Sequence, residues 1–416
     1  MKAFADARSD ARKGVSVLIS GARAGFALAG LLTLAGCGTT GMSGPFSGDN
    51  RPARSAPGQT GPLAAAAGDT IGSGPIRIAL ILPLTQASGP SGVGQSLRNA
   101  AELAMSESGS NAVTLLVKDD QSTPEGARAA AQAALDEGAQ AIIGPLYAPS
   151  MREVGRLARS ANKPVIAFST DTSATARGVY ALSFLVETQV TRVVDYAVSR
   201  GKKSFAALVP ENEYGNIALA QFQTVAAARG VRVQAIERYR PGGAAAAAQK
   251  IAGLADGIDA LFVPEQADQM AAVGSAITGA GLDVKRIQVL GTGIWNDSRV
   301  MRLPALQGAY FAAPDNAGFS VFAQKYRAKF NSDPVRIATL SYDAVSLLAA
   351  LAQMQGGQGF SEATLTNADG FKGADGLFRF RTDGQNERGL SVLQIRNGTT
   401  TVVSPAQQKF TTAPGT

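Results

Sequence analysis

The sequence Ile76-Arg-Ile-Ala-Leu-Ile-Leu82 begins the stretch, extending to Asp171, that decides the fold. Its apolar residues are uninterrupted apart from one arginine, which is typical of a strand buried on both faces of a parallel sheet. A loop rich in glycine and serine follows at 89–94. After the loop, apolar residues recur with the three- and four-residue spacing of one buried helical face, at Leu97, Ala100, Ala101 and Ala104.

This strand-loop-helix pattern repeats along the rest of the stretch. In order, the predicted segments are a strand at 113–117, a helix at 123–137, a strand at 141–143, a helix at 150–161 and a strand at 164–168. Thr123 is expected to cap the first of these helices, and Ser150 with Glu153 has the spacing of a capping box at the second. The alternation predicts a doubly wound parallel sheet, in which ligands bind beyond the carboxyl ends of the strands.

A second run of the same kind follows, so we predict two α/β lobes of the same architecture. Its predicted strands lie at 204–209, 231–236, 259–263 and 287–290, with loops at 210–215, 264–266 and 291–297. Two helices at 319–330 and 337–354 come next. The alternating segment 371–403, with turn signals at 383–384 and 397–398, predicts antiparallel strands.

The composition excludes several classes of function. The chain has 416 residues, 45% of them hydrophobic and 17% charged, which is a globular balance. Its net charge of +7 is spread along the chain without a basic cluster, which argues against nucleic-acid binding. The sequence has no histidine and one cysteine, which removes His-dependent nucleophiles, His or Cys metal sites and an internal disulfide. We therefore expect a non-enzymatic protein without a cofactor or metal.

The N-terminus predicts export and lipid anchoring. A basic segment ending at Arg23 precedes a short apolar run, as in a signal peptide. The run ends in Leu34-Ala-Gly-Cys37, which resembles the lipobox of bacterial lipoproteins, and the resemblance implies that Cys37 is lipidated. Gly38 takes the place of the aspartate that commonly retains such proteins in the inner membrane, which favours the outer membrane. Residues 37–75, rich in Gly, Ser, Pro and Ala, are predicted to form a flexible tether.

Six motifs in register give the rest of the chain a family resemblance. They are Asp119-Asp-Gln-Ser-Thr-Pro124, Gly144-Pro145, Pro164-Val-Ile166, Tyr214-Gly215, Tyr342-Asp-Ala-Val345 and Gly373-Ala-Asp-Gly-Leu-Phe-Arg-Phe380. In order and spacing they resemble the branched-chain amino-acid-binding proteins, which are type I periplasmic binding proteins with a leucine-binding-protein domain, over residues 76 to 403. Three phrases look closer to the penicillin-binding-protein activator lipoproteins: Ala167-Phe-Ser-Thr-Asp171, Leu290-Gly-Thr-Gly-Ile-Trp295 and Gly370-Phe-Lys-Gly-Ala-Asp-Gly376.

The resemblance implies two lobes joined by three crossovers, expected near Glu187, near Pro314 and near 356–357. The resulting division has a signal peptide at 1–36, a tether at 37–75, a first lobe at 76–187 and 314–356, a second lobe at 188–313 and 357–404, and a tail at 405–416.

The same resemblance implies a ligand site between the lobes. Ser169 and Thr170 match the second binding loop of the family, and Tyr214 matches the aromatic residue of its Tyr-Gly motif. Tyr147 takes the place of a small hydroxyl residue, a departure expected to narrow or fill the pocket. Glu265 and Trp295 fall in loops implied to line the site from the second lobe. Trp295, the only tryptophan of the sequence, fits either a wall of the site or a hydrophobic plug.

Two functions follow from these features. The first is an envelope receptor, facing the periplasm, that captures a small polar, amino-acid-like solute for an ABC permease. The second is a protein-binding module that activates a penicillin-binding protein in peptidoglycan synthesis. The family motifs and the polar loops at 169–173 and 210–215 favour the first. The three closer phrases, bulky Tyr147, Gly38 and the long tether favour the second.

Overall fold

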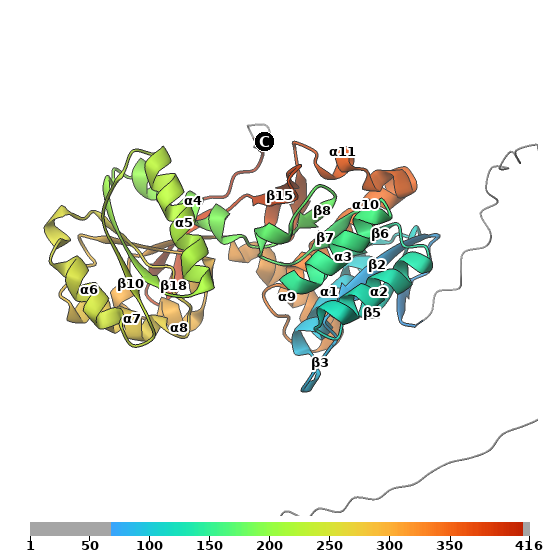
Figure 1. Ribbon diagram of the computed structural model, residues 1–416, viewed down its shortest axis with the longest axis horizontal. Helices are drawn as coiled ribbons and strands as arrows, with labels where there is room; N and C mark the ends of the chain where they lie inside the picture. Colours follow the sequence, from blue (N-terminus) through green and yellow to red (C-terminus); the bar gives the residue numbers. More distant parts are fainter. Residues whose placement is uncertain (1–67, 411–416) are drawn as a thin grey trace, which may run out of the picture. The chain divides into compact units, whose positions relative to one another are not determined.

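The computed structural model describes residues 68–410 of the chain. The predicted signal peptide, the predicted lipidation of Cys37 and nearly all of the tether lie outside the described residues. Two large sheets, each covered by helices on both faces, make up most of the described fold (Figure 1). They confirm the prediction of two doubly wound α/β lobes.

The first lobe is built on a six-stranded sheet with the order β1-β5-β2-β6-β7-β8. Its strands are parallel except β1, which pairs antiparallel with β5. The strands are β1 (Thr70–Gly72), β2 (Ile76–Leu82), β5 (Val113–Asp119), β6 (Ala141–Ile143), β7 (Val165–Ala167) and β8 (Val179–Ala181). The helices that connect them are α1 (Gly92–Ser108), α2 (Pro124–Asp136) and α3 (Ala148–Ser160).

Residues of β2 alternate between two cores. Ile78, Leu80 and Leu82 face α1 and α10 (Ala338–Gln355). Ala79 and Ile81 face α2 and α3. A strand buried on both faces has this near-continuous apolar sequence. The helix α9 (Asn316–Phe330) packs outside this layer, with Phe322 and Tyr326 against α1.

The second lobe is built on a seven-stranded sheet with the order β10-β9-β11-β12-β13-β17-β18. The first five strands are parallel, and β17 and β18 are added antiparallel. The strands are β9 (Ser204–Pro210), β10 (Arg232–Tyr239), β11 (Ala260–Phe262), β12 (Gln288–Gly291), β13 (Tyr310–Ala313), β17 (Ser391–Arg396) and β18 (Thr399–Ser404). One core lies under α4 (Val186–Ser199) and α5 (Glu213–Ala228), and the other lies under α6 (Ala244–Ala252) and α7 (Met270–Gly279).

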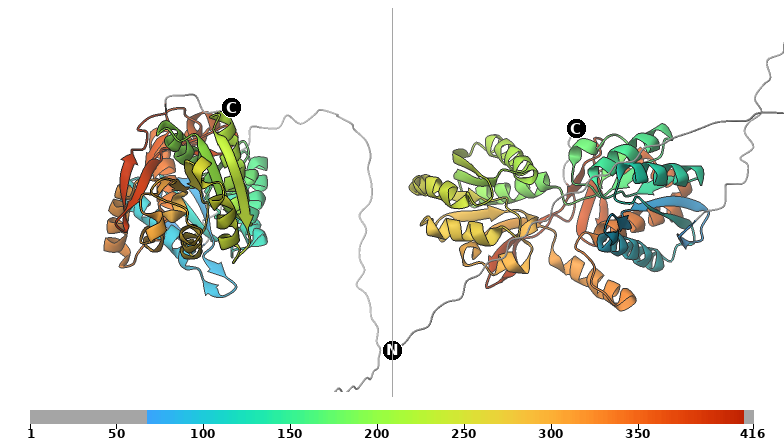
Figure 2. Two further views of the ribbon diagram at one scale, coloured as in Figure 1. Left: turned by 90° about the vertical axis from the view of Figure 1, so that its left-hand side faces the viewer. Right: turned by 60° about the horizontal axis from the view of Figure 1, so that its bottom comes forward.

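The remaining elements are short. The exposed hairpin of β3 (Thr85–Gln86) and β4 (Gly89–Pro90) projects from the first lobe (Figures 1 and 2). The others are α8 (Ser298–Met301), α11 (Glu362–Leu365), β14 (Phe371–Gly373), β15 (Gly376–Phe380) and β16 (Asn386–Arg388), with 3-10 turns at Thr172–Ala174, Ala255–Gly257, Gly293–Trp295, Pro304–Leu306 and Gly356–Phe360. Within residues 68–410, no helix combines the length and apolar character needed to cross a bilayer.

The third passage between the lobes differs from the sequence expectation. Strands β14, β15 and β16 form a sheet of their own, and Phe378 and Phe380 pack beside Tyr180 in the core of the first lobe. The chain therefore enters the second sheet between β16 and β17, well after the expected position at 356–357. An alternating antiparallel pattern predicts strands but does not say which core their apolar faces meet.

Two helix starts show where local sequence signals suffice and where they fail. The Oγ1 atom of Thr123 accepts a hydrogen bond of 2.9 Å from the backbone N–H of Gly126, which confirms the predicted N-cap. The capping box predicted at Ser150 is wrong, because α3 begins at Ala148, after Tyr147 in extended backbone. Ser150 is buried inside the helix, and its hydroxyl donates to the carbonyl of Thr123.

Candidate functional site

A pocket of about 790 Å3 is lined by residues from both lobes, and we call it the interlobe pocket. Loops that follow β6, β7 and β8 line it from the first lobe, and the start of α5 and the loop after β12 line it from the second. This placement agrees with the expectation that ligands bind beyond the carboxyl ends of parallel strands. The polar lining residues include Tyr147, Ser169, Thr170, Asp171, Ser183, Gln189, Glu213, Tyr214, Gln266, Asn296, Asp297 and Arg336.

The loop that carries Tyr147 is held by close backbone packing. Gly144 has a positive φ of 87°, and a Cβ atom added there would lie 2.0 Å from the carbonyl oxygen of Ile81. Only glycine fits this conformation and this approach without displacement. After the cis bond between Gly144 and Pro145, the chain places Tyr147 at the pocket with 38% of its surface exposed.

The loop after β7 supplies hydroxyl groups. Ser169 is buried, and its Oγ accepts a hydrogen bond of 3.1 Å from the backbone N–H of Asp171, so the hydroxyl proton remains available to a ligand. Thr170 is exposed at the pocket. Partial burial raises the pKa of Asp171, but hydrogen bonds from Ser173 and the cation of Arg152 outweigh it, and the net shift is downward.

In the second lobe, Tyr214 is fixed by its hydroxyl. Asn212 caps α5 through the backbone N–H of Gly215, which places Tyr214 in the first turn of the helix. The Tyr214 and Thr292 hydroxyls are 2.7 Å apart, and Thr292 is fully buried. Burial raises the pKa of Tyr214, so the phenol stays neutral at physiological pH and acts as a hydrogen-bonding group.

Arg336 brings a positive charge to the pocket. Its guanidinium donates two hydrogen bonds, of 2.8 and 2.7 Å, to the two carboxylate oxygens of Asp375. The same group lies 4.9 Å from the ring centre of Phe184 and 4.6 Å from that of Phe319. A paired and stacked guanidinium is held in one orientation, and its exposed edge can bind a carboxylate.

Four of the six predicted ligand-binding residues lie together in this pocket: Tyr147, Ser169, Thr170 and Tyr214. The other two do not line it. Glu265 is buried inside the second lobe, where it accepts a hydrogen bond from the hydroxyl of Tyr239. Its neighbour Gln266 lines the interlobe pocket instead. The loop after β11 therefore lines the interlobe pocket through Gln266 and not through Glu265.

Trp295 is a core residue and not a wall of the pocket. Its side chain is fully buried among the apolar residues under α6 and α7, with Ile294 and Asn296 lining the pocket on either side in sequence. A Cβ atom at Gly291 would lie 2.3 Å from the Trp295 ring, so the glycine makes room for the indole. The sequence did not distinguish these two roles for the only tryptophan.

Sequence reasoning missed Arg336 and Gln189. Gln189 lies on the buried face of α4, where its side-chain nitrogen donates to the carbonyl of Phe184 and its oxygen accepts from the N–H of Gly293 at 2.7 Å. A polar residue within the apolar stripe of a helix was a usable signal for this position. No local pattern marks Arg336, since its partner Asp375 is distant in sequence.

The lining supplies groups of both signs and several hydroxyls. Among the described residues that line the pocket, Arg336 is the one cation, and Asp171, Glu213 and Asp297 are the carboxylates. Such an arrangement can hold a small molecule with a carboxylate and a hydrogen-bond donor. Across residues 68–410, no group of three or more His, Cys, Asp and Glu side chains could hold a metal ion.

Comparison with known proteins places the chain in a family. Residues 75–400 match the family described as periplasmic binding protein. No curated protein matches the chain.

A branched-chain amino acid ABC transporter periplasmic ligand-binding protein from Burkholderia xenovorans has a TM-score of 0.66 and 17% identity, covering 81% of this chain and 97% of its own. A leucine-binding protein from Thermotoga maritima has a TM-score of 0.57 and 21% identity, covering 80% and 99%. An ABC-transporter solute-binding protein from Rhodopseudomonas palustris, in complex with 3,4-dihydroxybenzoic acid, has a TM-score of 0.59 and 21% identity, covering 82% and 99%. The chain belongs to the periplasmic binding protein family, with the two-lobed type I fold.

Proposed function

We propose that the protein binds a small polar, amino-acid-like solute in the interlobe pocket, as the non-enzymatic substrate-binding protein of an ABC transporter. The observation that carries this proposal is the pocket of about 790 Å3, which gathers hydroxyls from both lobes around Arg336, the one cation among its described lining residues. In the proposed complex, the hydroxyls of Ser169 and Thr170 and the guanidinium of Arg336 hold a carboxylate. Tyr147 and Tyr214 enclose the rest of the ligand.

The carboxylate is the best-supported part of the ligand. Leucine and 3,4-dihydroxybenzoic acid, named for two of the similar structures, both carry one. Arg336 is held by its two hydrogen bonds to Asp375 and by the rings of Phe184 and Phe319. Its remaining N–H groups can donate to a ligand carboxylate. The carboxylates in the lining provide partners for an ammonium group on the same ligand.

The test is a binding screen of the full chain after a mild denature-refold step that removes any co-purified ligand. Amino acids, benzoates and muropeptide fragments are compared by thermal shift, because a ligand that binds the native state raises the melting temperature. The class that scores is then titrated by calorimetry against Ser169→Ala, with Ser160→Ala as a matched control. Ser160 is an exposed serine in the last turn of α3, away from the pocket.

Loss of one hydrogen bond to a charged ligand costs about 1.5–3 kcal/mol, which weakens binding about tenfold or more. We expect that loss in Ser169→Ala and unchanged affinity in Ser160→Ala. A flat response of the well-folded wild-type chain to the whole panel contradicts the proposal.

We also propose that the protein is anchored in the cell envelope by lipidated Cys37 and faces the periplasm from the outer membrane. The lipobox-like sequence before Cys37, the Gly38 that follows it and the Gly/Ser/Pro-rich segment up to residue 75 support this. Mass spectrometry of the chain purified from membranes should show acyl chains on an N-terminal Cys37, and Cys37→Ser should abolish them. An unmodified mature N-terminus contradicts the anchor.

The second candidate function is activation of a penicillin-binding protein. The phrases shared with that branch, the outer-membrane signal at Gly38 and the exposed ring of Tyr147 favour it. Its test is direct binding to purified bifunctional peptidoglycan synthases, with and without stimulation of glycan polymerisation. Specific stimulation together with a flat solute screen supports the activator. Solute binding without any contact to the synthases supports the receptor.

A further inference from the structure

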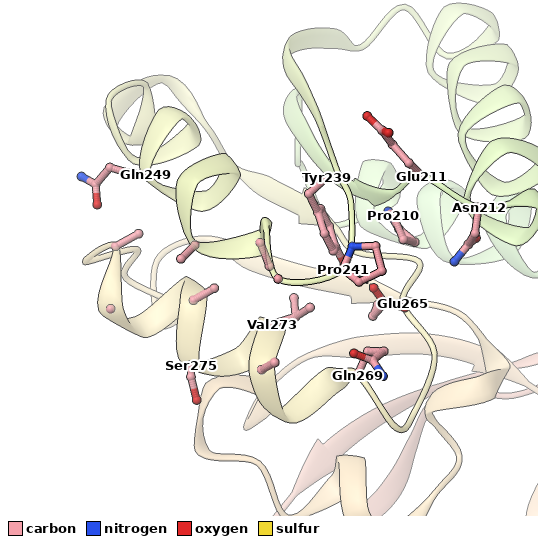
Figure 3. Close-up of a pocket in the computed structure, with 17 residues that line it drawn as sticks. Pro210, Glu211, Asn212, Tyr239, Pro241, Gln249, Glu265, Gln269, Val273 and Ser275 are labelled. Carbon is pink, nitrogen blue, oxygen red and sulfur yellow. Dashed lines mark hydrogen bonds between the residues drawn. The ribbon is translucent and has the colours of Figure 1, made fainter. Parts of the chain in front are cut away.

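A second cavity, of about 500 Å3, lies entirely within the second lobe between α6 and α7, and we call it the helix pocket (Figure 3). The loops after β9 and β11 close one end of it, at Pro210 and Glu265. No residue of the first lobe lines it. Its volume lies in the range of small-molecule sites.

The helix pocket is apolar in the middle and polar at its ends. Small or apolar side chains make up much of the lining, among them Pro241, Ala245 and Val273. Figure 3 shows Gln249 and Ser275 at one end and Glu265 with Gln269 at the other. An elongated ligand with an apolar body and one polar head fits this distribution better than a compact polar solute.

The polar end of the helix pocket contains the buried carboxylate of Glu265. It is only 3% exposed, and its Oε1 and Oε2 atoms accept hydrogen bonds from the backbone N–H of Gln266 and the hydroxyl of Tyr239. Burial and the hydrogen bond to this carboxylate raise the pKa of Tyr239, so the phenol remains a neutral donor.

Glu265 has no cationic partner among the described residues. No salt bridge to Glu265 is formed within 68–410, and neither Lys nor Arg occurs in the lining. The other carboxylate of the lining, Glu211, is already paired with Arg240 at 2.8 Å, so Glu265 is the lining carboxylate without a cation. A buried carboxylate that receives only neutral hydrogen bonds is costly relative to one paired with a cation. The charge distribution of the pocket therefore favours a positively charged occupant.

We propose that the helix pocket binds an organic cation that consists of a primary ammonium group on an apolar body. The ammonium donates to the free lone pairs of the Glu265 carboxylate and to the side-chain oxygen of Gln269. The apolar body lies between α6 and α7 against Val273 and the neighbouring alanines. A compact ammonium with three donors suits a carboxylate whose two oxygens already accept one bond each.

This site is separate from the interlobe pocket although the two share a wall. Glu265 lines the helix pocket and Gln266 lines the interlobe pocket, and Asn212 and Glu213 are divided in the same way. Binding of the amine can therefore be measured without any ligand in the interlobe pocket, and the result does not depend on the transport proposal.

The experiment is a calorimetric titration of the full chain with n-hexylamine, compared with hexan-1-ol and hexanoate of the same chain length. Glu265→Gln keeps the shape and removes the charge. Ala272→Trp places a large ring at an exposed position that lines the pocket, and Ala271→Trp is the matched control one residue away, exposed but outside the lining.

We expect one hexylamine per chain, with weaker binding of the alcohol and none of hexanoate. Glu265→Gln should weaken amine binding by at least about tenfold, the loss expected for a charge-assisted hydrogen bond. Ala272→Trp should weaken amine binding by filling the space that the apolar body occupies. Ala271→Trp should bind like the wild type. Absence of amine binding to the wild type, equal binding of all three probes, or full binding by Ala272→Trp overturns the proposal, and the last readout holds even where Glu265→Gln does not fold.

Discussion

Replacing Gly144 with alanine tests how the loop of Tyr147 is held against the first sheet. Gly144 has a φ of 87°, and an added Cβ would lie 2.0 Å from the carbonyl oxygen of Ile81. Gly178, in the same lobe, has a similar φ of 80°, but nothing lies within 4 Å of its added Cβ. The two positions share the backbone conformation and differ in the space around the new methyl group.

The magnitudes follow from that difference. A left-handed conformation costs an alanine about 1–2 kcal/mol, and both variants lose this amount. Gly144→Ala must also displace a backbone carbonyl of β2, and overpacking of this kind costs about 1–3 kcal/mol more. We therefore expect about 2–5 kcal/mol of destabilisation for Gly144→Ala and about 1–2 kcal/mol for Gly178→Ala.

Urea unfolding of both variants beside the wild type measures these losses, and an unchanged dependence on urea concentration shows that the unfolded states are comparable. Gly144→Ala should also weaken ligand binding in the interlobe pocket, because the displaced loop carries Tyr147. If the two variants lose the same stability to within about 0.5 kcal/mol, the close approach to Ile81 does not constrain this loop.

Three further predictions follow from buried groups. Trp295→Ala should destabilise the chain by about 3–5 kcal/mol in urea unfolding, because it empties a fully buried site. Thr292→Val should cost about 1–3 kcal/mol by leaving the Tyr214 hydroxyl without its partner, and Thr292→Ser should restore most of it. Burial raises the pKa of Asp343 from 3.8 to about 7 despite the nearby cation of Arg388, so between these values the native state holds a proton that the unfolded chain has released. The contribution of Asp343 to stability should therefore fall as pH rises from about 4 to about 7, and unfolding of Asp343→Asn measured over this range should lack that component.

The sequence predicts the layers of this fold because each layer rests on a local pattern. The continuous apolar run of β2 forms a buried strand, and the segments with apolar residues at helical spacing form α1 and α2. Thr123 capped a helix as predicted because its hydroxyl acts only three residues away. The loops that line the interlobe pocket could be located in the same way, since they follow the strands.

What the sequence did not predict depends on contacts between distant segments. Arg336 is oriented by Asp375, and the strand of Phe378 packs in the first lobe because Tyr180 and its neighbours offer an apolar surface there. Likewise, the side chains of Glu265 and Gln266 point to opposite sides of the loop after β11. Glu265 therefore lines the helix pocket, and its neighbour Gln266 lines the interlobe pocket. No periodic signal fixes the direction of side chains in an irregular loop.

Tyr147 links the two candidate functions of the interlobe pocket. Its bulk was expected to narrow or fill the site, yet a volume of about 790 Å3 remains with its ring among the lining residues. Its size is therefore no argument against a solute. At the same time, 38% of its surface is exposed, which leaves the ring accessible to a protein partner. A solute that occupies the pocket covers part of the same ring, so receptor and activator functions that both rely on Tyr147 compete for one side chain. A solute that binds in the interlobe pocket should therefore weaken any partner binding that depends on Tyr147.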